Sequence, residues 1–458
     1  MAKPLSFSAF VMNTASHIIH GLWRDEEGNQ AYFNDVDVWV NLAKRLDEGG
    51  FDTIFFADVI GLYGDHKGGW EFLAENGLQI PSNDPMVLMS ALAVNTKRLG
   101  LAFTAAPLQE HPFNFARRVS TLDHISKGRI AWNVVTGFQE NAFRNFGFDG
   151  LYQHDERYRW ADEYVDVLYK LWEGSWDEGA LLKDRESGVY ADSNRIHKIN
   201  HVGERYQVEG PHLSAPSPQR TPVIFQAGSS AAGRNFAARN AEAIFIVTPS
   251  PEVAREVIKD TRRIAEENGR DGNDIKFYQG LSFVIGDTEE EALRKEIKLE
   301  EKIDIDMMVA HLAGGLGIDM GNLPLDTPLE VIETDGVRSI AEWVQQSTPG
   351  RVPTIEDLAR LQGKTTRIVG TPESIADQLE RWQEAGVDGI NVINATIPGS
   401  YEEFIDKVIP VLRERGLARA ENEEATTLRH KLFGEDRLNE RHPAAQYRGA
   451  FATKSVTN

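Results

Sequence analysis

The regular alternation of short apolar runs with amphipathic segments constrains the fold of this chain more than any other feature of its sequence. Eight runs have the length and composition of buried strands, at residues 5–12, 53–57, 99–104, 130–135, 223–227, 243–247, 277–285 and 390–394. A segment with helical periodicity follows each of them. This alternation is typical of parallel βαβ units. Eight such units predict a (β/α)8 TIM barrel, with a doubly wound open sheet as the alternative.

The helix boundaries carry their own signals. Asp84-Pro85, Ser250-Pro251 and Thr371-Pro372 each place a capping side chain before a first-turn proline, the usual start of a helix. We expect helices at residues 36–48, from 85, from 112 to before Gly128, at 156–172, 231–240, from 251 to before Gly269, around 289–298, from 372 to before Gly386 and at about 401–415.

Three segments do not fit the repeat. Residues 175–221 and 304–367 are long insertions between predicted units, and a charged tail begins at about residue 421. The first insertion contains a polar, hairpin-like stretch at 194–210. Long insertions on a compact scaffold are usually lids, binding loops or subunit contacts. We therefore expect one barrel domain over residues 1–458 that carries two insertions and a C-terminal extension.

The composition excludes several classes of function. The chain has 49 Lys and Arg against 70 Asp and Glu, a formal net charge of −21, and no cysteine. A surface this acidic argues against nucleic acid and anionic membranes as partners. Without cysteine there are no disulfides, no thiolate nucleophile and no Cys-ligated zinc. The N-terminus lacks a signal peptide, and no apolar run reaches the length of a membrane span, so we expect a cytoplasmic protein.

Polar residues follow six of the predicted strands. In a TIM barrel these positions line the mouth where ligands bind, although each of them also suits a helix cap. The residues are Asn13 and Thr14 with His17 and His20 close behind, Asp58, Thr104, Asn133 and Thr136, Gln226, and Asn391 and Asn394. Such a mostly neutral, hydrogen-bonding ring suits a planar polar heterocycle better than a metal ion.

One of these turns has the features of a phosphate site. Residues 222–230 run from an apolar strand into Gly228, Ser229 and Ser230, and a predicted helix begins at residue 231. Gly228 allows the backbone to approach a ligand closely, and the hydroxyls and free N–H groups at the helix start can bind a phosphate. The alternative is an ordinary βα turn with a serine cap.

Other motifs with a known chemistry are missing from the sequence. There is no His-Glu-x-x-His zinc motif and no Gly-x-Ser-x-Gly nucleophile elbow. Neither a Walker A motif nor a Gly-x-Gly-x-x-Gly fingerprint follows a predicted strand. No metal site is therefore expected.

Six motifs spread along the chain resemble one family. They are His-Gly-Leu-Trp-Arg (20–24), Phe-Ala-Asp (56–58), Ser-Thr-Leu-Asp-His-Ile-Ser-Lys-Gly-Arg-Ile-Ala-Trp-Asn-Val-Val-Thr (120–136), His-Asp-Glu-Arg-Tyr (154–158), Pro-Ser-Pro-Gln-Arg-Thr-Pro-Val-Ile-Phe-Gln-Ala-Gly (216–228) and Pro-Gly-Ser-Tyr (398–401). The chain resembles the flavin-dependent monooxygenases of the bacterial luciferase-like superfamily. Within it, the chain is similar to the branch of nitrilotriacetate, dibenzothiophene sulfone, dimethyl sulfide and long-chain alkane monooxygenases.

The resemblance implies FMN, used as FMNH2, at the barrel mouth. Asp58 and Thr104 would contact the isoalloxazine region, and Asn133 would lie near the ring or the ribityl chain. The ribityl-phosphate end would be bound by residues of two helix starts, namely His154, Tyr158, Gly228, Ser229 and Ser230. This interpretation requires Asp155 and Glu156 to point away from the phosphate. The alternative for residues 154–158 is a helix N-terminus whose acidic residues suit the helix dipole.

The resemblance also implies that O2 is the co-substrate and that a flavin C4a-peroxide inserts one oxygen atom into a small organic substrate. His17 is the first candidate for the acid or base, and His311 is the second; each is also compatible with a structural role. Thr14, Tyr63, Gln79 and Phe138 would line the substrate pocket. Thr14 and Phe138 replace a cysteine and a histidine of the alkane-oxidising member, so its substrate does not transfer directly.

The expected partners are an NAD(P)H:FMN reductase, which supplies FMNH2, and further copies of this chain. We expect a homodimer or homotetramer in which residues 421–458 pack on a neighbouring subunit. Two alternatives remain open at this point. One is a deazaflavin-dependent oxidoreductase of the same superfamily, and the other is a flavin-binding protein without catalysis.

Overall fold

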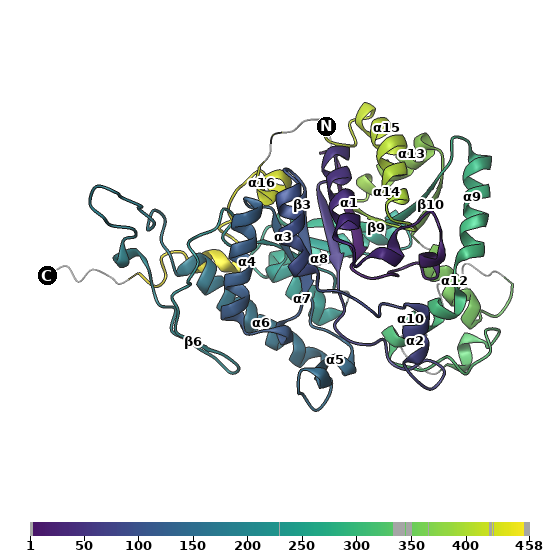
Figure 1. The fold of residues 1–458 in the computed structure, drawn as a ribbon, viewed down its shortest axis with the longest axis horizontal. Coiled ribbons are helices and arrows are strands. Elements are labelled where there is room, and N and C mark those ends of the chain that lie inside the picture. The colour runs from purple at the N-terminus through teal and green to yellow at the C-terminus, as the bar shows by residue number, and fades with distance from the viewer. Residues whose placement is uncertain are drawn as a thin grey trace.

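The protein forms a closed parallel barrel (Figure 1). The computed structural model describes residues 3–228, 230–332, 344, 350–364, 366–420, 424 and 426–452. The barrel strands, in spatial order, are β1 (Ser6–Met12), β2 (Thr53–Ala57), β3 (Gly100–Ala105), β4 (Ile130–Val134), β7 (Val223–Gln226), β8 (Ala243–Ile246), β9 (Lys276–Ile285) and β11 (Gly389–Ile393). Parallel pairing of β8 with β9 and of β11 with β1 closes the ring. The predicted TIM barrel is confirmed, and the open sheet is wrong.

Aromatic side chains fill the inside of the barrel. The ring centroids of Phe55 and Phe225 lie 5.4 Å apart, and those of Phe225 and Tyr278 lie 5.5 Å apart. All three residues are at most 1% exposed. A barrel filled in this way is a core and not a channel, so a ligand has to bind above it, at the C-terminal ends of the strands.

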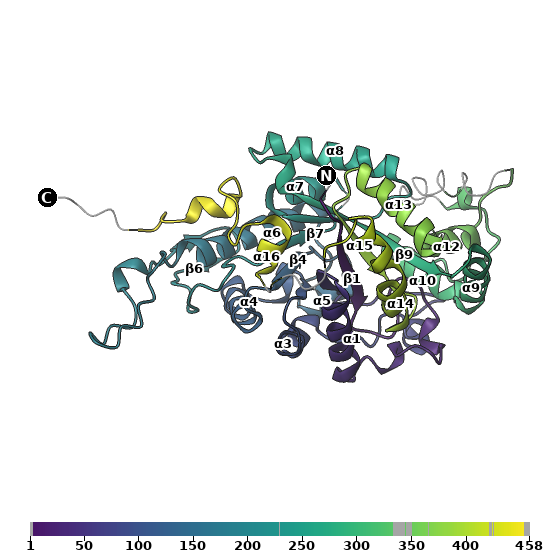
Figure 2. The same cartoon turned by 90° about the horizontal axis from the view of Figure 1, so that it is seen from above.

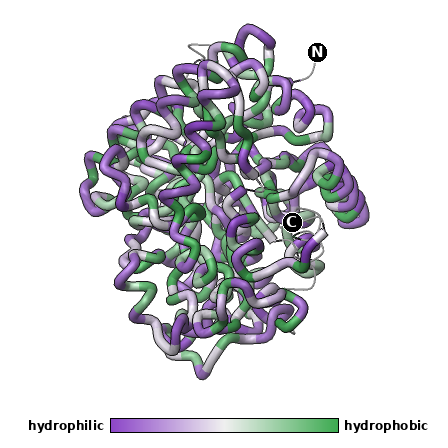
Figure 3. The backbone as a smooth tube through the Cα atoms, turned by 90° about the vertical axis from the view of Figure 1, so that its right-hand side faces the viewer, coloured by the Kyte–Doolittle hydropathy of each residue, from purple (hydrophilic) through white to green (hydrophobic). Residues whose placement is uncertain are grey.

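Helices surround the strands (Figure 2), and the outer helices alternate hydrophilic and hydrophobic stretches along their length (Figure 3). The predicted caps are confirmed: Asp84 accepts from the backbone N–H of Met86 at 2.7 Å, and Ser250 and Thr371 cap their helices in the same way. The helices are α1 (Val36–Gly49), α2 (Glu71–Asn76), α3 (Pro85–Asn95), α4 (Pro112–Ser126), α5 (Glu140–Asn145), α6 (His154–Tyr169), α7 (Ala231–Asn240), α8 (Pro251–Glu267), α9 (Glu289–Lys302) and α13 (Pro372–Glu384).

Two predicted helices are less regular than expected. The helix predicted at 156–172 is α6 followed by a π-helical turn, Lys170–Gly174. The helix predicted at 401–415 is divided into α14 (Gly399–Glu403), a π-helical turn (Phe404–Val408) and α15 (Ile409–Glu414). Pro410 gives the reason in the second case, because it has no N–H to donate to the preceding turn.

The second insertion contains structure that the sequence patterns did not predict. Residues 304–367 contain α10 (Ile305–Leu316) and α12 (Ile355–Lys364), and they lead into β10 (Arg367–Gly370). β10 pairs with the C-terminal half of β9, beyond the part of β9 that closes the barrel. β10 pairs only with the extended end of β9, a contact that the sequence pattern of this segment does not show.

The first insertion extends to one side of the barrel in both ribbon views, beside the C-terminal segment (Figures 1 and 2). It contains a small antiparallel pair, β5 (His201–Val202) and β6 (Gln207–Val208). This pair lies within the stretch that was predicted to be hairpin-like.

The C-terminal tail packs against its own barrel. In α16 (Leu428–Phe433), Leu428 and Leu432 join the inner core of the barrel. Arg429 is 1% exposed and forms an ion pair with Glu242, with Nε 2.7 Å from Oε1. The apolar face of α16 is therefore buried within its own chain, and the packing of residues 421–458 on a neighbouring subunit stays a prediction.

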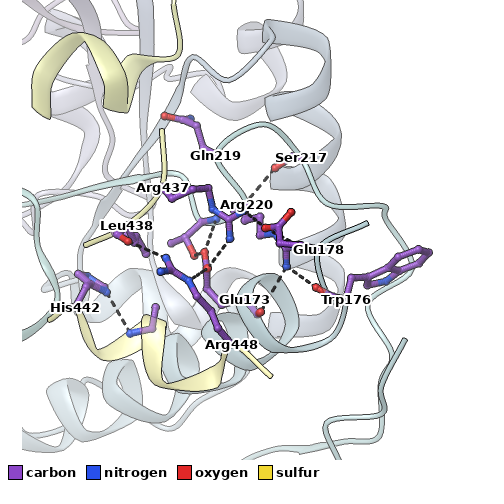
Figure 4. Close-up of polar contacts among 12 residues, drawn as sticks. Glu173, Trp176, Glu178, Ser217, Gln219, Arg220, Arg437, Leu438, His442 and Arg448 are labelled. Carbon is purple, nitrogen blue, oxygen red and sulfur yellow. Dashed lines mark hydrogen bonds and ion pairs between the residues drawn. The ribbon is translucent and has the colours of Figure 1, made fainter. Parts of the chain in front are cut away.

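A buried acidic residue anchors the rest of the tail (Figure 4). Glu173 Oε2 lies 3.0 Å from both Arg437 Nη2 and Arg448 Nε, and its Oε1 accepts from the Thr221 hydroxyl at 2.7 Å. Burial by itself would raise the pKa of Glu173, but the two arginines outweigh it and hold the pKa below its ordinary value. The carboxylate therefore stays charged and ties the tail to the barrel.

In the part of the chain that the structure describes, no helix combines the length and the apolar character needed to cross a membrane.

Candidate active site

The polar residues at the ends of β3 and β4 form a short hydrogen-bonded chain. The Thr104 hydroxyl donates to the carbonyl of Phe56 at 2.8 Å and accepts from Asn133 Nδ2 at 3.0 Å. Asn133 Oδ1 is buried and has no hydrogen-bond partner within the described part of the chain. A buried acceptor of this kind is costly to leave unpaired. Thr104 thus orients Asn133, and the free oxygen of Asn133 is available to a ligand with an N–H or O–H group.

The starts of α6 and α7 meet at the predicted phosphate turn. His154 Nε2 lies 3.0 Å from the hydroxyl of Ser230, which also caps α7 by accepting from Gly233 N–H at 3.1 Å. Burial raises the pKa of Tyr158, and hydrogen bonds that include one with Ser230 lower it only in part. The structure therefore brings His154, Tyr158 and Ser230 together. Ser229 lies outside the described residues.

The acidic residues beside His154 are directed elsewhere, as the phosphate interpretation requires. Asp155 Oδ1 lies 3.1 Å from Nδ1 of His154, which leaves Nε2 directed at Ser230. Glu156 is paired with Arg205 at 2.8 Å. Neither carboxylate is directed at the turn, so a negative charge there meets the hydroxyls of Tyr158 and Ser230 and the backbone N–H groups of the first turn of α7.

Gly228 is required by close packing. A Cβ on this residue would lie 2.5 Å from Gln226 Nε2 and 2.8 Å from both Gly233 Cα and the Tyr158 hydroxyl. Real Cβ atoms do not approach other atoms that closely, so any other residue would displace the turn. The backbone here therefore lies directly beside the hydroxyl of Tyr158.

A cavity of about 610 Å³ opens beside the end of β2. Its lining includes Asp58, Gln79 and Asp84 together with the apolar side chains of Ile60, Trp70 and Phe146. Burial, assisted by the neighbouring charge of Asp84, raises the pKa of Asp58 to about 8. At neutral pH the Asp58 carboxyl is therefore mainly protonated and can donate a hydrogen bond.

The two candidate histidines lie near one another at the mouth. Burial, with a smaller contribution from His311, lowers the pKa of His17 to about 3, and burial lowers the pKa of His311 to about 4. Both imidazoles are therefore neutral at neutral pH. The Tyr63 ring lies 4.6 Å from that of His311, and burial raises the pKa of the Tyr63 hydroxyl. The structure thus places His311 of the second insertion beside the loop that follows β2.

The remaining predicted pocket residues differ in their surroundings. Thr14 is buried, and its hydroxyl donates to the carbonyl of Pro81 at 2.8 Å. Gln79 has a φ of 53°, unusual for a residue other than glycine, and its Nε2 donates to the carbonyl of His17 at 3.0 Å. Phe138 is 41% exposed, with its ring 5.8 Å from that of Tyr63. Thr14 and Gln79 therefore shape the wall of the mouth, and Phe138 forms part of its rim.

Four strand-end residues that the sequence placed at the mouth without a specific role also take part in this site. His20 is fully buried and contacts His311 directly, Asn13 Oδ1 is a second buried acceptor without a partner among the described residues, and Thr136 and Gln226 hydrogen-bond to Tyr158. All four lie at or after the ends of strands in the sequence, and position alone does not show which strand-end residues face one another. No group of three or more His, Asp or Glu residues in the described part of the chain is arranged to hold a metal ion.

The fold and the site together define the class of this protein. A closed parallel barrel with polar side chains at the C-terminal ends of its strands, a cavity beside them and neutral titratable groups at the mouth is the arrangement of a TIM-barrel enzyme. The chain belongs to the luciferase-like monooxygenase family, whose family model matches residues 16–389. The resemblance of the six motifs is thereby confirmed.

Individual relatives match nearly the whole chain. The dimethyl-sulfide monooxygenase of Hyphomicrobium sulfonivorans is 43% identical, over 99% of this chain and 96% of that protein. The long-chain alkane monooxygenase of Geobacillus thermodenitrificans is 41% identical, over 98% and 99%. Nitrilotriacetate monooxygenase component A of Aminobacter aminovorans is 33% identical, over 91% and 94%. The structure of a riboflavin lyase with modified FMN and its substrate riboflavin has a TM-score of 0.89 at 36% identity, over 97% of this chain and 100% of that one.

Proposed function

We propose that this protein is the oxygenase of a two-component system. It binds reduced FMN at the barrel mouth and inserts one atom of O2 into a small organic substrate, and a separate NAD(P)H:FMN reductase supplies the FMNH2. The observation that carries the proposal is the meeting of Tyr158, His154 and Ser230 around Gly228, in a chain that belongs to the luciferase-like monooxygenase family.

The residues at the mouth fit FMN. The first turn of α7 offers backbone N–H groups to a phosphate, and the hydroxyls of Tyr158 and Ser230 lie beside it. Buried oxygens without partners, Asn133 Oδ1 and Asn13 Oδ1, suit the N–H and O–H groups of a polar ring and a ribityl chain. Gly228 allows the backbone of the turn to lie directly beside the Tyr158 hydroxyl. A crystallised relative of this fold holds a modified FMN.

Bound reduced flavin would supply the two electrons that O2 activation requires. Side chains at the barrel mouth would then hold the protons close to the bound flavin. Asp58 is protonated below about pH 8 and can donate a hydrogen bond. His17 and His311 are neutral and can donate from one ring nitrogen and accept at the other. Tyr63 keeps its proton and packs against His311.

The substrate class stays open between organosulfur compounds, hydrocarbons and aminopolycarboxylates, on which the named relatives act. The apolar side chains around the cavity suit a small and mainly apolar substrate. The relative named as component A supports a separate reductase component. We also propose that the protein is a homodimer or homotetramer, formed through surfaces other than the apolar face of α16.

Oxygen incorporation tests this proposal. The protein is supplied with FMNH2 by a flavin reductase under 18O2 and offered a dialkyl sulfide, a long-chain alkane and an aminopolycarboxylate. One of these should gain one 18O atom per FMNH2 consumed. Oxidation of FMNH2 to hydrogen peroxide alone with every compound would contradict the proposal. So would O2-independent hydride transfer from a deazaflavin.

A further inference from the structure

Two buried imidazoles share a hydrogen bond at the mouth of the barrel. His20 Nε2 lies 2.8 Å from His311 Nδ1, and the two rings meet edge to face at 87° with centroids 4.6 Å apart. His20 is 0% exposed, whereas His311 keeps 9% of its surface exposed. His20 is therefore fully enclosed, whereas the histidine that it contacts keeps a small part of its surface open.

Backbone contacts fix the positions of these two histidines relative to each other. The N–H of Asp304 donates to the carbonyl of His20 at 3.1 Å, and Asp304 caps α10, the helix that carries His311. Arg24 adds an ion pair to Asp304 at 3.3 Å. Gly21 has a φ of 94°, and a Cβ on it would lie 2.8 Å from Asp304 N. The motif at 20–24 thus fixes the second insertion, and with it His311, against the loop after β1.

The burial of His20 determines which nitrogen carries the shared proton. Burial lowers the pKa of both rings, with the charge of His311 adding to the effect on His20, so both are neutral and one of them has to donate. His20 Nδ1 is buried and has no hydrogen-bond partner among the residues that the structure describes. If His311 donated, His20 Nδ1 would carry a buried N–H without an acceptor, which folded proteins avoid more strictly than an unpaired acceptor. His20 Nε2–H is therefore the donor.

The consequence falls on the other nitrogen of His311. With Nδ1 accepting from His20, the proton of His311 is on Nε2, and no residue in the described part of the chain is bonded to that atom. We propose that His20 is a positioning residue that fixes His311 as an Nε2–H hydrogen-bond donor toward the ligand. The geometry of the pair stands on its own, but its role in turnover depends on the proposed oxygenase function.

Nitrogen NMR of the histidine rings tests the tautomer without any turnover. The 15N-histidine-labelled wild-type protein is compared with His311→Gln to assign the His311 signals, because the two neutral tautomers have distinct ring-nitrogen shifts. We expect His311 protonated on Nε2 in the wild type and in His20→Gln, whose amide N–H can replace the donor. We expect a mixture of tautomers in His20→Phe. A wild-type His311 protonated on Nδ1 would overturn the inference, as would an unchanged tautomer in His20→Phe.

Turnover gives a second and separate readout. His20→Phe should lower kcat by about tenfold, the effect of about 1.4 kcal/mol, with unchanged KM and FMNH2 affinity, and His20→Gln should restore most of it. His212→Phe is the matched control, because this variant also loses a buried imidazole, but one away from the mouth. His212 is 3% exposed and hydrogen-bonded to Ser120 at 2.9 Å. An equal loss of kcat in His20→Gln and His20→Phe would overturn the positioning role. Absence of oxygenation in the wild type would contradict the proposed function and leave the NMR result standing.

Discussion

Replacing Gly228 with alanine adds one methyl group at the most crowded point of the proposed phosphate turn. The new Cβ would lie 2.5 Å from Gln226 Nε2 and 2.8 Å from Gly233 Cα. Gln226 cannot easily move, because its Oε1 accepts from Gly228 N–H at 2.6 Å, and Gly233 Cα belongs to the backbone of α7. Overpacking of this kind costs about 1–3 kcal/mol. If this free-energy cost destabilises the conformation of the turn that binds the ligand, the affinity for FMN drops about 5- to 150-fold.

Equilibrium titration with FMN, and anaerobically with FMNH2, measures this loss. The matched control is Gly150→Ala, where the nearest atom to the new Cβ is Glu140 Oε1 at 3.7 Å, an ordinary contact. Thermal unfolding of both variants separates a local effect from a general loss of stability. If Gly228→Ala binds FMN within twofold of the wild type while it folds normally, the phosphate is not held at this turn.

Three further predictions concern titration, the tail and proton transfer. Folding raises the pKa of Asp58 to about 8, so the folded state binds more protons than the unfolded state between about pH 4 and 8, and the stability of the wild type falls as pH rises through that window. The melting temperature of Asp58→Asn relative to the wild type should therefore increase from pH 5 to pH 8, and a difference that stays constant would refute the raised pKa. Arg429→Met leaves Glu242 buried without its ion-pair partner, so the free energy of unfolding measured with denaturant should fall by about 3–5 kcal/mol. The exposed control Arg294→Met should lose about 0.5 kcal/mol or less, and equal losses in the two variants would show that the tail is not docked as described. His17→Ala removes a neutral imidazole, so the kcat of product formation should fall by no more than about tenfold, which corresponds to the loss of one hydrogen bond. A fall in kcat by a factor of about 10²–10⁴ would instead indicate that His17 transfers a proton.

Most of the fold could be predicted from the sequence, because the barrel strands are short apolar runs separated by helices with clear caps. Asp84-Pro85 is an example, where the cap and the first-turn proline are visible in two letters. The parts that were missed depend on tertiary contacts. β10 is a strand only because the end of β9 extends beyond the barrel to pair with it. α16 has too few residues to show a period, and it is fixed by the burial of Arg429 against Glu242.

The site was predictable as a set of positions but not as a set of contacts. Strand-end residues such as Asn133 lie at the mouth as expected, since the fold alone dictates it. The sequence could not show that Thr104 is bonded to Asn133 and to the Phe56 carbonyl. Nor could it show that His20 and His311, 291 residues apart, share a hydrogen bond, because the course of the second insertion determines that contact.

A comparison of FMN with riboflavin tests the central claim most directly, because the two ligands differ only in the phosphate. A charge-assisted hydrogen bond to the phosphate is worth about 1.5–3 kcal/mol. The wild type should therefore bind FMN at least about tenfold more tightly than riboflavin. Tyr158→Phe should reduce that difference and leave riboflavin binding unchanged. Equal wild-type affinity for the two ligands, or an equal loss of both in Tyr158→Phe, would contradict a phosphate site between α6 and α7.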